Sequence, residues 1–168
     1  MMQATFWLTI GAAAAIGLLA GASLDQSIKQ LPARRRLGVV AYSEYSQASD
    51  LGNGVVFYAT LGVGAALLTI AAAVAAQVAG LPGRACLPAD LGAALAVLHS
   101  LATARAAPTN FSQRRARGDP AALWRVFDRF ARWQAVRAGL QVATFGVLLW
   151  AVVEFVRLDS PPNIEGAD

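Results

Sequence analysis

Four uncharged stretches constrain the fold of this chain more than any other feature of its sequence. Residues 2–24 and 51–83 contain no charged side chain, and neither do the shorter stretches 91–104 and 138–153. A helix needs about 20 predominantly apolar residues to cross the hydrocarbon core of a bilayer. The two longer stretches meet that length, and the two shorter ones approach it before their flanks are added. The pattern predicts an integral membrane protein with four spans.

The predicted architecture is an all-α, integral membrane four-helix bundle with a long amphipathic cytoplasmic helix leading into its last span. We expect a single domain over residues 1–158, with spans at about 5–24, 52–79, 88–107 and 136–157, and a flexible acidic tail at 159–168. The third span is the weakest, because Pro88 lies at its start and Arg105 and Pro108 lie at its end. Without it the chain would have three spans, and its termini would lie on opposite sides.

The first span admits two further interpretations. Ala20-Gly21-Ala22 resembles a signal-peptide cleavage site, but no positive region precedes the apolar run, so we expect this segment to be retained. Gly17 and Gly21 form a GxxxG pattern, which lets two helix backbones approach closely in lipid. Alanine-rich helices also produce such patterns by chance.

Both long polar connections contain helical signals. Pro32 suits the first position of a helix, and Leu37, Val40, Ala41 and Tyr45 then recur at helical spacing, as in an interfacial amphipathic helix. In the second connection, Asp119-Pro120 reads as an N-cap followed by proline at the first helical position. No proline or glycine interrupts residues 121–138, so one long helix is expected to continue into the fourth span.

The distribution of lysine and arginine predicts the orientation in the membrane. The connections 25–50 and 105–137 hold four and eight of these cations, whereas the other side holds only Arg84 and Arg157. Because cations collect on the cytoplasmic side, we expect a multi-pass protein of the inner (plasma) membrane with both termini outside. The same arginines predict contacts with anionic lipid headgroups rather than with nucleic acid, since no nucleic-acid motif accompanies them.

The inventory of reactive side chains is short. Cys86 is the single cysteine and His99 the single histidine, so no internal disulfide and no histidine–cysteine zinc site can form. Gly62-Val63-Gly64 lacks the third glycine of a dinucleotide loop, and the sequence has no phosphate-binding loop. We therefore expect no cofactor and no metal.

The predicted topology gathers polar residues near the cytoplasmic ends of the spans. Arg137 is the sharpest of them, because an ionisable side chain inside an apolar stretch needs a partner or a polar cavity. A closed, paired Arg137 would indicate anchoring, whereas an Arg137 facing a cavity shared with Asn110 would indicate a site. His99 lies near the middle of the third span and is the candidate general base. The alternatives without a functional role are an Arg137 whose side chain reaches the lipid headgroups and a His99 that is hydrogen-bonded to a neighbouring helix. The candidate catalytic residues are His99 and Arg137, and the candidate substrate-binding residues are Asn53, Asn110, Trp133, Gln134 and Gln141.

The motifs around these residues resemble a known family. Ala106-Ala107-Pro108-Thr109-Asn110 is similar to its Asn-x-Pro-x-Asn pattern, and Trp133-Gln134-Ala135-Val136-Arg137 is similar to its Trp-Asn-x-x-Arg pattern. The family consists of small four-span membrane proteins, mostly of unknown function, that includes the anthrone oxygenases of polyketide pathways. The resemblance implies cofactor-independent oxidation of an aromatic small molecule by dioxygen. Two asparagines of the patterns are replaced here, by Ala106 and Gln134.

Two functional hypotheses follow. The first is an anthrone-oxygenase-like monooxygenase with a cytoplasm-facing polar pocket. In it His99 or a nearby carboxylate serves as base, Arg137, Asn110 and Gln134 hold oxygen atoms, and Trp133 stacks on the ring. The alternative is a non-enzymatic membrane subunit whose small-residue faces pack against a second copy or another membrane protein.

Overall fold

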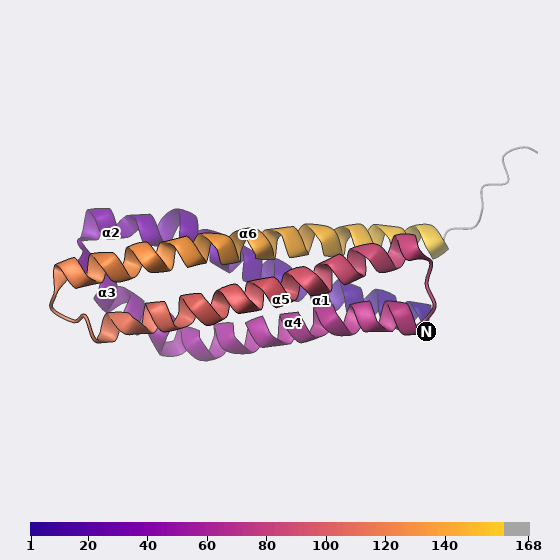
Figure 1. Cartoon of the computed structure of the whole chain (residues 1–168), viewed down its shortest axis with the longest axis horizontal. Helices are drawn as coiled ribbons and strands as arrows, with labels where there is room; N and C mark the ends of the chain where they lie inside the picture. The colour runs from indigo at the N-terminus through magenta and orange to yellow at the C-terminus, as the bar shows by residue number, and fades with distance from the viewer. Residues whose placement is uncertain (160–168) are drawn as a thin grey trace, which may run out of the picture.

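The computed structural model describes residues 1–159 and is helical throughout, with no strand in that range. Four long helices, α1 (Met2–Asp25), α4 (Gly54–Val78), α5 (Gly83–Phe111) and α6 (Pro120–Asp159), form the bundle (Figure 1). The shorter elements are η1 (Gln26–Gln30), α2 (Leu31–Leu37), α3 (Val39–Ala48), η2 (Ser49–Asn53) and η3 (Ser112–Arg114). The tail predicted at 159–168 lies, apart from its first residue, outside the described residues.

Each of four helical segments is long and apolar enough to cross a membrane, as expected for a multi-pass membrane protein. The third segment, the weakest in the sequence, is one of them: α5 is continuous, and both Pro88 and Pro108 lie inside it. Proline removes one backbone hydrogen bond and does not by itself end a helix in a membrane, where neighbouring groups can compensate. Helix α5 therefore extends beyond the predicted third span at both ends.

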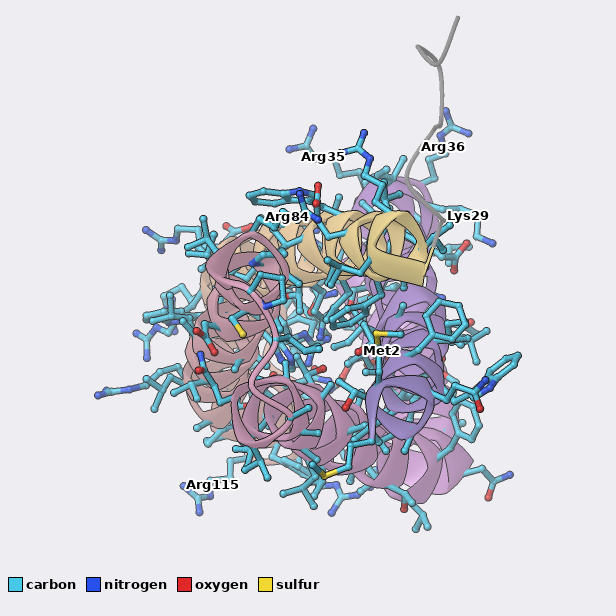
Figure 2. All side chains as sticks on the ribbon, turned by 90° about the vertical axis from the view of Figure 1, so that its right-hand side faces the viewer. Met2, Lys29, Arg35, Arg36, Arg84 and Arg115 are labelled. Atoms are coloured by element: carbon cyan, nitrogen blue, oxygen red, sulfur yellow. The ribbon has the colours of Figure 1, made fainter. Side chains whose placement is uncertain are left out.

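The bundle closes as a ring in which α1 packs against α4 and α6, and α5 packs against the same two helices. Viewed along its axis, the four long helices surround a common interior (Figure 2). Small residues dominate two of the three buried clusters, for example Ala12, Ala13 and Ala65 against Leu148. A Cβ on Gly92 would lie 3.1 Å from Leu148 Cδ2. Small side chains let the helix backbones approach closely, which is how helices associate in lipid.

Helix α6 has 40 residues and, at 1.5 Å per residue, is about 60 Å long, roughly twice the thickness of the hydrocarbon core. Its first half packs with α2 and α3 at one end of the bundle (Figure 1). There Tyr42 and Phe127 meet edge to face, with ring centroids 4.9 Å apart. The uninterrupted sequence from 121 to 138 is thus part of one helix.

The first polar connection differs from the amphipathic helix expected there. Gly38, with φ of 82°, separates α2 from α3, so the segment is two short helices. The buried face of α3 consists of Val39, Tyr42, Ser43 and Ser46, whereas Val40 and Tyr45 are exposed. The apolar residues Val40 and Tyr45 therefore lie on the outer face of α3, and serines hydrogen-bonded inside the protein occupy its inner face.

Candidate functional site

A cavity of about 420 Å³ lies in the half of the bundle nearest α2 and α3. It exists because α4 packs tightly only in its second half: its buried residues are Ala65, Thr69, Ala72, Ala73 and Ala76, and none precedes Ala65. A kink at Gly52, with φ of −95° and ψ of −117°, sets the direction in which α4 leaves the π-helical turn η2. The unpacked face of α4 then forms one wall of the cavity.

Arg137 lies on α6 at the polar end of this cavity. Its Nη2 donates a hydrogen bond to Gln26 Oε1 at 3.2 Å, and Gln26 Nε2 donates to Asp50 Oδ2 at 3.1 Å. The amide of Gln26 thus bridges a guanidinium and a carboxylate that attract each other electrostatically. Arg137 therefore has a countercharge inside the protein, and its Nε has no hydrogen-bond partner among residues 1–159.

A second hydrogen-bonded chain reaches Asp50 from the opposite direction. Ser46 Oγ donates to Asp50 Oδ2 at 3.0 Å and accepts from Gln113 Nε2 at 3.2 Å. Gln113 also donates to Asn110 Oδ1 at 2.8 Å and accepts from Ser43 Oγ at 2.9 Å. Since Gln113 and both serines are almost fully buried, these contacts join α3, η2, η3 and α5 at this end of the cavity.

Several buried polar atoms in the cavity lining lack a hydrogen-bond partner within the described part of the chain. They are both ring nitrogens of His99, Arg137 Nε, Gln141 Oε1 and Gln30 Oε1. His99 is only 2% exposed and lies on α5, one wall of the cavity. Buried polar groups are nearly always hydrogen-bonded, so a cluster of unpaired ones around one cavity needs an explanation. A ligand with both donor and acceptor groups would satisfy them.

Four of the seven candidate residues line this one cavity, namely His99, Arg137, Asn110 and Gln141. They come from the two helices α5 and α6. Arg137 and Asn110 line the same cavity, which is the arrangement expected of a binding site rather than of an arginine that only anchors the helix. Two nearby acids do not pair with Arg137: Asp25 forms an ion pair with Lys29 and accepts a hydrogen bond from Gln30, and Glu44 is exposed.

Three candidate residues do not line the cavity. Asn53 is exposed at the end of η2, and Trp133 is 37% exposed on α6. Gln134 is fully buried between helices, where its Nε2 donates to Ser23 O at 3.1 Å and so ties α6 to α1. Trp133 and Gln134 precede Arg137 by about one helical turn, yet neither lines the cavity, so the site proposed below does not include these three residues.

Four further residues line the cavity that were not among the candidate site residues, namely Gln26, Gln30, Asp50 and Tyr58. Asp50 carried a usable signal, because it is an acid directly before a long uncharged stretch. Gln26 and Gln30 carried little, since glutamine in a polar connection is ordinary. Among residues 1–159, no three His, Cys, Asp or Glu side chains come together as a metal site would require.

We find no match for the chain among protein-family models, curated proteins or solved structures. The resemblance of its motifs to the anthrone-oxygenase family therefore remains an expectation. What the fold defines on its own is a four-helix, membrane-type protein with a partly polar internal cavity.

Proposed function

We propose that the protein is a membrane-bound, cofactor-independent oxygenase that binds an uncharged aromatic small molecule in the cavity, as the anthrone oxygenases it resembles do. The observation that carries the proposal is the cluster of unpaired polar atoms on His99, Arg137 and Gln141 around one cavity. Its volume of about 420 Å³ falls in the range of about 300–1,000 Å³ typical of small-molecule sites.

The reaction proposed is the oxidation of an anthrone to an anthraquinone. A base removes one proton from the methylene carbon opposite the ketone, which gives an enolate with its charge on the ketone oxygen. This electron-rich carbon reduces dioxygen and becomes a hydroperoxide once a proton is returned. Loss of the second methylene proton with cleavage of the O–O bond forms the new carbonyl and releases water. One anthrone and one O₂ thus give one anthraquinone and one H₂O.

In this proposal His99 is the base, because both of its ring nitrogens are unpaired among the described residues and it faces the cavity. Asp50 is less suited, since its Oδ2 already accepts hydrogen bonds from Gln26 and Ser46. Arg137 stabilises the oxyanion through its unpaired Nε, because a preorganised donor is most effective in a site of low dielectric.

Oxygen uptake with dihydroxyanthrone as substrate tests the proposal. We expect the purified full chain in lipid nanodiscs to consume oxygen and form dihydroxyanthraquinone in equal amounts. Arg137→Gln should lower the turnover number by about 100-fold or more, as loss of an oxyanion donor does. The matched control is Arg132→Gln, an exposed arginine on the same helix outside the cavity, which should retain wild-type turnover. Wild-type turnover equal to that of empty nanodiscs would refute the proposal.

The alternative is a non-enzymatic membrane subunit. Its sequence support was the small-residue faces of the spans. One of these is the GxxxG pattern, in which Gly17 faces inward: a Cβ there would lie 3.0 Å from Phe145 Cε2 of α6. That glycine serves a contact within the chain. Extraction in mild detergent distinguishes the hypotheses, because a stoichiometric protein partner supports the subunit and a lone chain that retains a small molecule supports the oxygenase.

We further propose that the arginine-rich end lies in the cytoplasm against anionic lipid. The cations of both polar connections gather at this end, opposite the N-terminus (Figure 1). Arg35, Arg36 and Arg115 are exposed and point away from the bundle (Figure 2). The melting temperature of the protein in nanodiscs should then rise with the fraction of anionic lipid, and salt should weaken this effect.

A further inference from the structure

The cavity is not equally enclosed on all sides. Of its lining residues, those that are exposed are Tyr58, Ala59 and Val63 on α4 and Ser100, Ala104 and Phe111 on α5. The lining residues of α1 and α6 are buried or half-buried. The exposed residues therefore mark an opening between α4 and α5, called here the α4/α5 mouth.

The end of the cavity nearest the arginines is closed. The buried hydrogen-bonded chain from Asn110 through Gln113 and Ser46 to Asp50 crosses it. Arg114 Nη2 adds a hydrogen bond to Leu51 O at 3.0 Å, which ties η3 to η2. A molecule entering from the cytoplasmic side would have to break these contacts.

The α4/α5 mouth lies mostly within the uncharged parts of its two helices. Most of its residues belong to the uncharged stretches 51–83 and 91–104, and none of the six is charged. The helices α4 and α5 run side by side (Figure 1) and are joined at the opposite end, where the buried residues of α4 lie. The gap between them is thus bordered by apolar and small side chains that face the hydrocarbon core.

We infer that the substrate enters the cavity sideways from the bilayer, through the α4/α5 mouth. Resting on the proposed function, this inference restricts the substrate to uncharged ring compounds that dissolve in lipid and insert their oxygen-bearing end first. The apolar mouth passes such a molecule, and the unpaired groups of His99 and Arg137 lie beyond it. A charged or strongly hydrated molecule is excluded, because moving it through the hydrocarbon core is costly.

A cysteine inside the cavity tests the route without any substrate. Cys86 is buried outside the cavity, so a Cys86→Ala chain carrying Gly62→Cys has one reactive thiol, placed where a Cβ has nothing within 4 Å. In nanodiscs, reagents dissolved in water can reach the protein from both sides of the bilayer. The thiol should react readily with uncharged N-phenylmaleimide. With a quaternary-ammonium methanethiosulfonate it should react at least about tenfold more slowly than Ala121→Cys, an exposed position in the polar connection.

A second test of the route narrows the α4/α5 mouth with a bulky side chain. Ala104→Trp should slow the maleimide reaction of Gly62→Cys by about tenfold, because the indole fills the gap between the helices. Leu101→Trp is the matched control, since Leu101 is exposed on the same helix but does not line the cavity. Ala59→Trp repeats the test from α4 should the first variant misfold.

The inference is overturned if the charged reagent labels Gly62→Cys nearly as fast as Ala121→Cys, or if the mouth variants label like Leu101→Trp. These rates do not depend on oxidation. Labelling as expected with no oxygen uptake would therefore refute the proposed function alone.

Discussion

Filling the cavity from a position that the fold tolerates should weaken ligand binding without disturbing the bundle. Gly62 lines the cavity, and a Cβ built on it has no atom within 4 Å. It shares a helix face with Val55 and Ala59, which also line the cavity. A leucine at this position displaces on the order of 100 Å³, about a quarter of the cavity volume of 420 Å³.

The expected loss of ligand affinity follows from the volume that the leucine displaces. A rigid three-ring ligand cannot adapt to a lost quarter of its site, and overpacking of this kind costs about 1–3 kcal/mol. The dissociation constant of Gly62→Leu for dihydroxyanthraquinone should therefore rise by roughly tenfold or more. Equilibrium titration of the quinone's fluorescence in nanodiscs measures it.

Gly64→Leu is the matched control for the cavity-filling variant. Gly64 lies on the same helix, also has nothing within 4 Å of a built Cβ, and does not line the cavity. It should bind the quinone like wild type, with the same elution profile in size-exclusion chromatography. If Gly62→Leu also binds like wild type, the cavity is not the ligand site.

Two further predictions concern stability and are read from thermal unfolding in detergent. Arg34→Met should destabilise the chain by about 1–3 kcal/mol, because it removes the hydrogen bond from the buried Arg34 to Asp128 at 2.9 Å; an unchanged melting temperature would contradict this. Gly17→Ala should destabilise by about 1 kcal/mol or more, since its Cβ meets Phe145. Gly21→Ala should stabilise by up to about 1 kcal/mol, because it lies inside α1 and nothing lies within 4 Å of its Cβ; equal effects of the two alanines would refute the assignment of Gly17 to an internal contact.

The sequence predicted the helical architecture well because membrane helices depend on length and charge alone. Uncharged stretches of about 20 residues leave a chain few alternatives in lipid. The structure of the connection at residues 31–48 was harder to predict. The break at Gly38 depends on local backbone geometry. The buried face of α3 depends on serine hydrogen bonds to Gln113. Apolar periodicity cannot report that kind of burial.

The candidate site was predictable where one polar residue stood out against an apolar background. His99 and Arg137 were found for that reason, and Asn110 and Gln141 because they lie at the same depth. Gln134 was a candidate because of its depth and its place in the motif, and it lies about one helical turn from Arg137, yet its amide donates to Ser23 O between α6 and α1. Only three-dimensional packing decides which of these residues reaches the cavity.

The role of His99 as a base in the cavity can be tested by the turnover of dihydroxyanthrone by wild type and by His99→Gln, followed as oxygen uptake. We expect wild type to form one anthraquinone per O₂ consumed. His99→Gln should lose about 100-fold or more of the turnover while binding dihydroxyanthraquinone with a near wild-type dissociation constant. Turnover by His99→Gln equal to that of wild type would contradict the assignment of His99 as the base of a catalytic cavity.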